Sequence, residues 1–420
     1  MTATPKIAII GAGPGGCMLA RLLTQRSIPC IIYEAEPSPD YRSQGGTLDL
    51  RSNTGLAAIR AAGLYDQFRK LARYDGEYML ITDKKLTTWM KRSPGKEGKS
   101  NGVQEAPEID RKVLRKMLFE CLPPDVVRWG HKLLRVDEKD LSLHFADGSV
   151  ESGFDLIVGA DGAWSKVRNL VSSEKPFYAG MGGYNFTIPD AREKAPQAYK
   201  FVNRGSVFAY SDGKNVNGQF LGDGSINVST YSLRDEDWIK RESKEGVKTT
   251  DLVTAKQKQK DVVHGWAPEL LNLIDSAQGD VDKRNLYMLP VGFRWAHKKG
   301  ITLLGDAAHL MTPFAGIGVN TAFYDAMLLA DAVAGCIERQ RSDDLDIAII
   351  EYEKKMLDHA HEGQKLTFGC MNDMYLTEGA PRTSIESYLL RHISQEFPRW
   401  SLPFVAAVLY TGFFFYKLFV

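Results

Sequence analysis

The stretch KIAIIGAGPGGC, residues 6–17, decides the fold of this chain of 420 residues. A short apolar run, typical of a buried strand, leads at once into glycines spaced as GxGxxG. Residues 17–26 then carry apolar side chains at helical spacing, and residues 28–33 form a second β-branched run. A strand, a glycine loop, a helix and a second strand within about 30 residues open a doubly wound α/β fold.

Each glycine of this loop has its own role in a dinucleotide-binding turn. Gly11 permits the tight turn, Gly13 lets the backbone approach a pyrophosphate, and Gly16 allows the helix to pack closely on the strand. The free N–H groups and partial positive charge of the helix N-terminus then favour phosphate. Glu34, which follows Gly16 by 18 positions, would accept hydrogen bonds from ribose hydroxyls. The pattern predicts a dinucleotide site without separating FAD from NAD.

Composition and charge exclude several classes of protein. A hydrophobic content of 44% with 25% charged residues indicates a globular chain. The 53 basic and 52 acidic residues give a net charge of +1, which argues against nucleic acid as the main partner. The five cysteines are scattered and form no CxxC pair, so we expect no disulfide framework, no metal site and a reducing compartment. We expect no signal peptide, because the strand-like run already begins at Lys6.

Two kinds of apolar patterning divide the chain. Residues 155–160 and 301–304 are further buried-strand runs, whereas residues 225–233 alternate apolar and polar side chains as in an antiparallel sheet. We therefore expect a discontinuous Rossmann-like domain that carries an inserted α+β domain. The expected boundaries are 1–74, 103–173 and 285–344 for the first domain, 75–102 and 174–284 for the inserted domain, 345–397 for a C-terminal bridging helix region, and 398–420 for an apolar tail.

Three further segments favour FAD over NAD. DLIVGADG at 155–162 resembles the DG motif of flavoprotein hydroxylases, and GDAAH at 305–309 resembles their GD motif. PFAGIGVN at 313–320 resembles the loop and helix start that lie against the flavin and the pyrophosphate. From residue 6 to about 375, the chain thus resembles the single-component, class A, FAD-dependent monooxygenases. The inserted domain is then expected to hold the substrate.

A narrower resemblance adds further cofactor contacts. GGTLDL at 45–50 and PEIDR at 107–111 are similar to segments of the bacterial tetracycline-inactivating flavin monooxygenases. The resemblance implies that Arg111 lies beside the FAD phosphate and ribityl oxygens and that Arg42 contacts NADPH. A surface arginine in a first helical turn is the alternative for Arg111. The full set of expected FAD contacts is Gly11, Gly13, Gly16, Glu34, Asp49, Arg111, Asp161, Asp306, Pro313, Gly316, Gly318 and Val319.

The narrower resemblance fails where substrate specificity lies. Gly183, Ser206 and Asn227 stand where that family carries its polar tetracycline ligands, a glutamine, an arginine and a histidine. We therefore expect weak or no oxidation of tetracyclines. Met371 and Met374 would cap the substrate site, or else belong to the core.

The resemblance implies an FAD- and NADPH-dependent monooxygenase that hydroxylates an apolar aromatic or polycyclic small molecule, such as a secondary metabolite. Epoxidation and Baeyer–Villiger insertion are the other oxygenations considered. Oxygen would be transferred through a flavin C4a-hydroperoxide formed with O₂, so no side chain is assigned as catalytic. His309 is expected to be packed beside the flavin, with a role as general base as the alternative. The alternatives are a flavin-dependent reductase of prenyl-type lipids and a prenyl-lipid carrier without redox chemistry.

The C-terminus is apolar and rich in aromatic residues. From Trp400 to Val420 the only charge is Lys417. A helix of this length would just span a hydrocarbon core of ~30 Å, although Pro403 and Gly412 interrupt it. We expect the tail to enter a membrane, cover the protein's own surface or contact another subunit. The protein is expected in the cytoplasm, or on a membrane facing it.

Overall fold

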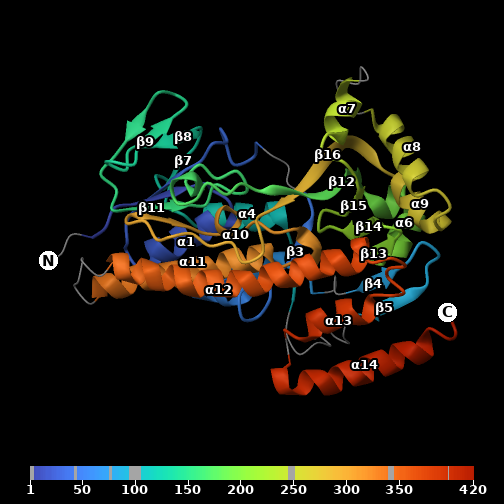
Figure 1. The fold of residues 1–420 in the computed structure, drawn as a ribbon. Helices are drawn as coiled ribbons and strands as arrows, with labels where there is room; N and C mark the ends of the chain where they lie inside the picture. Colours follow the sequence, from blue (N-terminus) through green and yellow to red (C-terminus); the bar gives the residue numbers. More distant parts are fainter. Residues whose placement is uncertain are drawn as a thin grey trace. The chain divides into compact units, whose positions relative to one another are not determined.

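The computed structural model describes residues 4–41, 45–74, 78–93, 106–244, 251–338, 345–395 and 397–420, and these form two compact units (Figure 1). Unit 1 comprises Met1–Ala72, Ile109–Phe177 and Tyr287–Lys365. Unit 2 comprises Arg73–Glu108, Tyr178–Leu286 and Leu366–Val420. The region 345–397, which we expected to bridge the two domains, is divided between the units after Lys365.

A five-stranded parallel sheet forms the core of unit 1, with the strand order β17-β11-β1-β2-β7. The strands are β1 (Ile7–Ile10), β2 (Cys30–Tyr33), β7 (Val127–Arg128), β11 (Leu156–Gly159) and β17 (Ile301–Leu303). The central strand β1 is buried at every position, as its continuous apolar sequence predicts. Strand β1 lies between β2 and β11, so the strand order reverses at β1. Ligands of open α/β sheets bind at the carboxyl ends of the strands where the order reverses, which is where the loop after β1 lies. The predicted doubly wound fold is confirmed.

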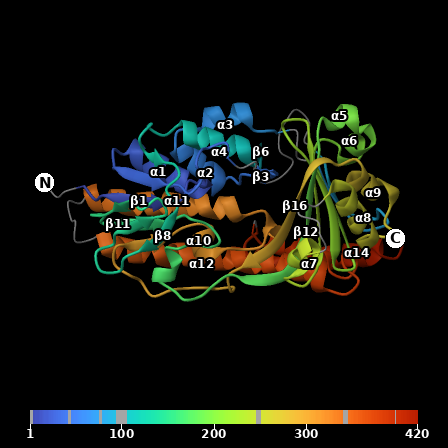
Figure 2. The same ribbon diagram turned by 90° about the horizontal axis from the view of Figure 1, so that it is seen from above.

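Helices cover this sheet, and α1 packs against α11 (Figure 2). The helices of unit 1 are α1 (Pro14–Gln25), α2 (Gly55–Ala61), α3 (Tyr65–Leu71), α4 (Arg111–Glu120), α10 (Asp306–His309), α11 (Gly318–Glu338) and most of α12 (Leu345–Met371). Two small sheets are also present, formed by β3 (Thr47–Asp49) with β6 (Glu108–Asp110), and by β8 (Leu133–Val136), β9 (Leu143–Phe145) and β10 (Val150–Glu151).

Unit 2 is built on a seven-stranded sheet with the order β16-β12-β15-β14-β13-β4-β5. The strands are β4 (Met79–Thr82), β5 (Thr88–Arg92), β12 (Phe177–Ile188), β13 (Ser206–Ser211), β14 (Lys214–Phe220), β15 (Ile226–Leu233) and β16 (Gln278–Met288). The sheet is antiparallel from β12 through β13, whereas β13 and β4 are parallel. The alternating segment 225–233 is β15, so the predicted antiparallel sheet is confirmed.

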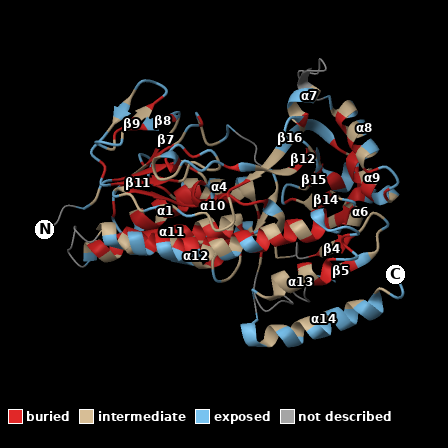
Figure 3. Ribbon diagram, viewed as in Figure 1, coloured by how far each residue is buried: buried red, intermediate tan, exposed pale blue. Residues whose placement is uncertain are grey.

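One face of this sheet carries the apolar core of unit 2. Alternate residues such as Val207, Val216 and Val228 pack with Val202 and Leu273 from the covering helices, where burial is nearly complete (Figure 3). The helices of unit 2 in this region are α5 (Ala191–Lys194), α6 (Pro196–Val202), α7 (Trp238–Lys244), α8 (Leu252–Val262) and α9 (Pro268–Asp275).

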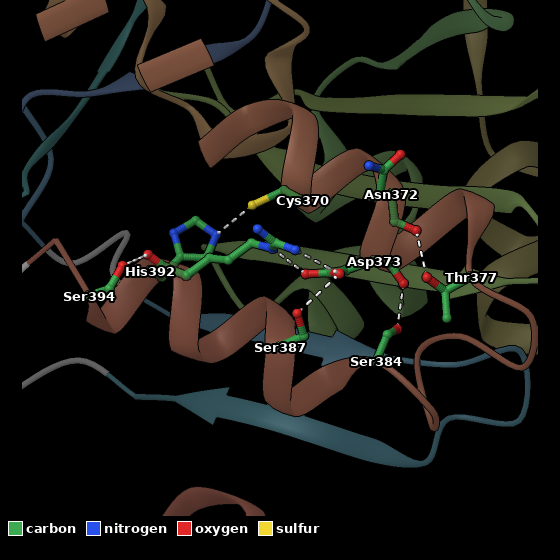
Figure 4. Close-up of polar contacts among 9 residues, drawn as sticks. Cys370, Asn372, Asp373, Thr377, Ser384, Ser387, His392 and Ser394 are labelled. Atoms are coloured by element: carbon green, nitrogen blue, oxygen red, sulfur yellow. Dashed lines mark hydrogen bonds and ion pairs between the residues drawn. The ribbon is translucent and has the colours of Figure 1, made fainter. Parts of the chain in front are cut away.

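A buried aspartate fixes the C-terminal helices to the end of α12. There the chain widens into a π-helical turn, η5 (Asn372–Leu376), before α13 (Ile385–Ile393). The carboxylate of Asp373 accepts hydrogen bonds from Arg391 Nε at 2.7 Å and from Ser387 Oγ at 3.2 Å, and Ser384 Oγ donates to its backbone oxygen (Figure 4). Three side chains of α13 and its N-cap thus hold one residue of η5.

The C-terminal helix α14 (Leu402–Tyr416) has no buried residue. Tyr416 donates a hydrogen bond to Thr88 O at 2.6 Å, and Lys417 pairs with Glu386 at 2.6 Å. Across the described part of the chain, no helix has the length and apolar content needed to cross a bilayer. The 15 residues of α14 fall short of the ~20 that a bilayer requires, so the structure does not support the spanning alternative for residues 398–420.

A glycine in β12 gives a test of this sheet. A Cβ at Gly183 would lie 1.8 Å from the backbone oxygen of Thr230, so even alanine must displace the neighbouring strand. At Gly218 in β14, a Cβ would meet only the ends of the Val202 and Leu273 side chains, at 3.0 and 3.1 Å. We expect Gly218→Ala to cost about 1–3 kcal/mol and Gly183→Ala to cost more, measured by urea unfolding. Equal losses would contradict the register of β12 and β15.

Candidate cofactor site

The loop after β1 has the backbone that the GxGxxG pattern predicts. Gly11 has a φ of +108°, and a Cβ there would lie 2.4 Å from Ala160 O. A Cβ at Gly16 would lie 2.2 Å from Gly11 O. At Gly13, in contrast, no atom lies within 4 Å of the Cβ position. Gly11 and Gly16 are therefore required by packing, whereas the backbone at Gly13 borders open space of the kind that a pyrophosphate needs.

Glu34 acts on the same loop. At the end of β2, its Oε2 accepts a hydrogen bond from Ala12 N at 2.6 Å, and its Oε1 accepts one from Glu36 N at 2.9 Å. The carboxylate thus holds the glycine loop itself, a role that the sequence did not indicate. Each oxygen keeps a further lone pair, so the ribose contact stays a prediction.

Asp161 follows β11 and also serves its own loop. Its Oδ1 accepts a hydrogen bond from Ser165 Oγ at 2.5 Å, and its Oδ2 accepts one from Lys166 N at 2.6 Å. Burial raises the pKa of Asp161, and these hydrogen bonds oppose the rise. The carboxylate keeps the loop after β11 in a fixed shape beside Gly11.

Asp306 lines a recess of unit 1. Its side chain is exposed to solvent, yet the surrounding protein desolvates it enough to raise its pKa, against the positive charges of His309, Arg111 and Arg168. The carboxylate of Asp306 is accessible to water and is also surrounded by protein atoms, so it must lie in a concave site. The buried Arg168 fixes the adjacent backbone by donating to Ala307 O at 3.0 Å.

A buried His–Asp pair lies behind this turn. Asp325 Oδ2 accepts hydrogen bonds from His309 Nε2 at 2.7 Å and from Gly305 N at 2.9 Å. Burial disfavours the imidazolium, but the charge of Asp325 and its hydrogen bond outweigh burial and raise the pKa of His309. Asp325 therefore fixes both ends of the segment that carries Asp306. Sequence reasoning missed it because no motif marks a partner 16 residues from His309.

Asn320 has a similar role at the start of α11. Its Oδ1 accepts hydrogen bonds from Arg51 N at 2.8 Å and Gly55 N at 3.2 Å, and its Nδ2 donates to Asp49 O at 2.7 Å. One side chain thus joins the segment 49–55 to α11. The only signal for it in the sequence was its position at the end of PFAGIGVN.

Two further predicted glycines also have open Cβ positions. Gly316 has a φ of +64°, and at both Gly316 and Gly318 no atom lies within 4 Å of the Cβ position. Pro313 is exposed, and the half-buried Arg111 begins α4. All twelve expected FAD contacts lie in unit 1, whereas Met371 and Met374 lie in unit 2. Arg42, the expected NADPH contact, lies outside the described residues.

Comparison with known proteins agrees with this geometry. Residues 4–362 match the sequence model of a family described as an FAD binding domain. The chain is 30% identical to monooxygenase penA of Penicillium thymicola over 425 residues, which cover 89% of this chain and 96% of that protein. It is 25% identical to the 6-hydroxynicotinate 3-monooxygenase of Pseudomonas fluorescens, covering 87% and 91%. The crystal structure of tetracycline destructase Tet(51) has the same fold, with a TM-score of 0.67, 18% identity and coverage of 96% and 98%.

The family match extends from before β1 into α12 and so includes the recess around Asp306. The identity to a monooxygenase runs over nearly the full length of both chains. This protein therefore belongs to the FAD-dependent monooxygenases, which are oxidoreductases that bind FAD.

Proposed function

We propose that this enzyme uses FAD and NADPH to oxygenate, above all to hydroxylate, an aromatic or polycyclic small molecule. The observation that carries the proposal is that the Cβ positions of Gly13, Gly316 and Gly318 are all open, in the unit that also carries the exposed Asp306. Bound FAD supplies electron transfer from NADPH and the activation of O₂. The relative that is a 6-hydroxynicotinate 3-monooxygenase, named for a heteroaromatic substrate, supports an aromatic substrate here.

We assign the cofactor contacts according to the sequence motifs. Gly13 and the N-terminus of α1 bind the pyrophosphate, since α1 has no side-chain cap and its first N–H groups need an acceptor. Asp306 and Arg111 bind the ribityl chain and phosphate, and Glu34 binds the ribose. The set is completed by Gly11, Gly16, Asp49, Asp161, Pro313, Gly316, Gly318 and Val319. Arg42 remains our candidate for the NADPH contact.

We place the substrate on the face of the unit 2 sheet opposite its apolar core. Ser206 pairs with Gln219, which pairs with Asn227, so these side chains lie on one face. Asn227 also pairs with Thr187, four residues from Gly183, which puts Gly183 on that face as well. The three positions that depart from the tetracycline-inactivating family thus share this face. Its backbone has no room for a side chain at Gly183, which supports a different substrate.

We propose that Met371 and Met374 contact the substrate beside this face. Met374 lies in η5, which packs on β13, and Met371 is the last residue of α12. Both are nearly fully buried, at 3% and 1% exposure. Contact with the substrate is expected of their flexible side chains and stays a prediction.

The function can be tested on the FAD-loaded enzyme. We expect NADPH oxidation and O₂ uptake to rise together with a polyphenol or polycyclic substrate, and the product to gain one oxygen atom by mass spectrometry. Tetracycline should stimulate both weakly or not at all. NADPH oxidation coupled to a reduced product without O₂ uptake would instead indicate a reductase.

Gly13 provides a test of the cofactor site that leaves the fold intact. Its φ of −69° and ψ of 172° suit any residue, and its Cβ position is open. We expect Gly13→Val to purify as a folded protein without the visible absorbance of flavin. Gly16→Val is the matched control, because its Cβ would overlap Gly11 O and should prevent folding. A Gly13→Val protein with full flavin content would place the phosphates elsewhere.

Asp325→Asn tests the buried pair. The pKa of His309 is raised in the folded state, so the charged pair adds to the stability of the fold. This contribution is complete below the ordinary histidine pKa of about 6.5 and is lost as the pH rises through the pKa of His309 in the folded protein. The variant should therefore lose about 3–5 kcal/mol at pH 6 and less at pH 9, and bind FAD more weakly. Asp331→Asn, also on α11 but exposed in an ion pair with Arg26, should change little. A loss independent of pH would show that His309 is neutral.

A further inference from the structure

The face of the unit 2 sheet opposite the apolar core is covered with uncharged polar side chains. Strand pairing arranges them in three rows across β13, β14, β15 and β12. We call this surface the amide face. Its first row is Ser206, Gln219, Asn227 and Thr187, and its second row is Phe208, Asn217, Ser229 and Asn185. Its third row is Tyr210, Asn215, Tyr231 and Gly183. A sheet face of this composition is built for hydrogen bonding and not for a core.

Two amides on β14 keep hydrogen-bonding groups unused. Asn215 Oδ1 accepts a hydrogen bond from Tyr231 N, which fixes the orientation of the amide and leaves Nδ2 as its available donor. In the part of the chain that the structure describes, neither Asn215 Nδ2 nor Asn217 Oδ1 has a hydrogen-bond partner. The two side chains are 0% and 9% exposed, so water satisfies neither fully. Each such group costs about 1–3 kcal/mol until it meets a partner.

The donor and the acceptor are arranged for a single ligand. Asn215 and Asn217 are two residues apart on one strand, so they share a face at a spacing of about 7 Å. A ligand that offers a carbonyl or hydroxyl oxygen to Asn215 and an N–H or O–H group to Asn217 satisfies both. An aromatic ring with two such substituents has these dimensions.

The described titratable side chains of the amide face, and the tyrosine that packs on it, are uncharged. Burial raises the pKa of the Tyr210, Tyr231 and Tyr375 hydroxyls, so all three stay protonated. Asn185 hydrogen-bonds to the Tyr231 side chain, and Tyr375 packs edge-on against Tyr210 at 5.5 Å between ring centroids. No member of the three rows carries a charge.

The charged residues that act on Tyr231 are paired with each other. Asp282 and Arg284 on β16 both influence the pKa of Tyr231, but they form an ion pair of 2.6 Å with each other. A carboxylate bound at Asn215 and Asn217 would lose its hydration without gaining a cation from the described residues of the amide face, which is far more costly than burying a neutral amide.

We propose that the amide face selects an uncharged aromatic substrate that carries a hydrogen-bond acceptor for Asn215 and a donor for Asn217, and rejects aromatic carboxylates. The proposal rests on the proposed function, because it names the substrate class of that oxygenation. Asn215 and Asn217 are then the specificity-determining residues. A site built to hydrogen-bond its substrate discriminates strongly, because an unsuitable ligand leaves its buried polar groups unpaired.

Matched pairs of ligands test this on the FAD-loaded enzyme. Salicylamide and salicylate share ring and size but differ in charge, as do 3-hydroxy-2-naphthamide and its carboxylate. We expect at least one amide to bind ten times more tightly than its carboxylate at pH 7.5, from the change in flavin absorbance on titration. If neither amide binds more tightly than its carboxylate, the proposal is wrong.

Variants of the two asparagines complete the test. Asn217→Leu removes the acceptor at similar volume and should weaken amide binding about tenfold. Asn215→Asp keeps the acceptor for Tyr231 N but removes the donor, and should also weaken amide binding. Asn272→Leu, the same change on the helix α9, is the control and should leave both affinities unchanged. Unaltered amide affinity in Asn217→Leu and Asn215→Asp would overturn the assignment.

The two levels of the proposal fail in different ways. An enzyme that retains FAD and consumes NADPH and O₂ with a carboxylate as its better ligand would disprove the substrate class alone. An enzyme that consumes no O₂ with any aromatic compound would disprove the proposed function itself.

Discussion

The contact on which the cofactor site depends is the close approach of Gly16 to the carbonyl oxygen of Gly11. A Cβ at Gly16 would lie 2.2 Å from that oxygen, so α1 can begin directly at the end of β1 only if both positions lack side chains. Gly11 in turn lies against the backbone of Ala160, which follows β11. This packing joins the ends of two neighbouring strands, and the open backbone at Gly13 follows from it. Unit 1 then surrounds the opening with charged groups, whereas the amide face of unit 2 is neutral.

The sequence predicted the fold because its signals are local. The continuous apolar run of β1 corresponds to a strand with two buried faces, and the alternation in β15 corresponds to a strand with one apolar face. The tail was harder to predict, because composition marks residues 400–420 as apolar but does not reveal that α14 ends at Tyr416.

Less of the site could be predicted, because the residues that shape it act over long distances in the chain. Asn320 bonds to Asp49 across 271 positions, and Asp325 bonds to the backbone of Gly305. Neither contact leaves a pattern in the sequence, although both residues stand in or near motifs that were recognised. The amide face had a partial signal, since alternate residues of β14 are amides, but alternation alone does not say which face is the core. The assigned contacts with FAD, NADPH and substrate stay predictions.

The site is held together by the protein's own hydrogen bonds. Glu34 holds Ala12, Asp325 holds Gly305, and Asn320 holds Asp49. A recess that is already shaped loses little conformational entropy when it is filled. Because Glu34, Asp325 and Asn320 each order a different segment of this site, a change at any one of them should lower both the stability of unit 1 and its affinity for the cofactor.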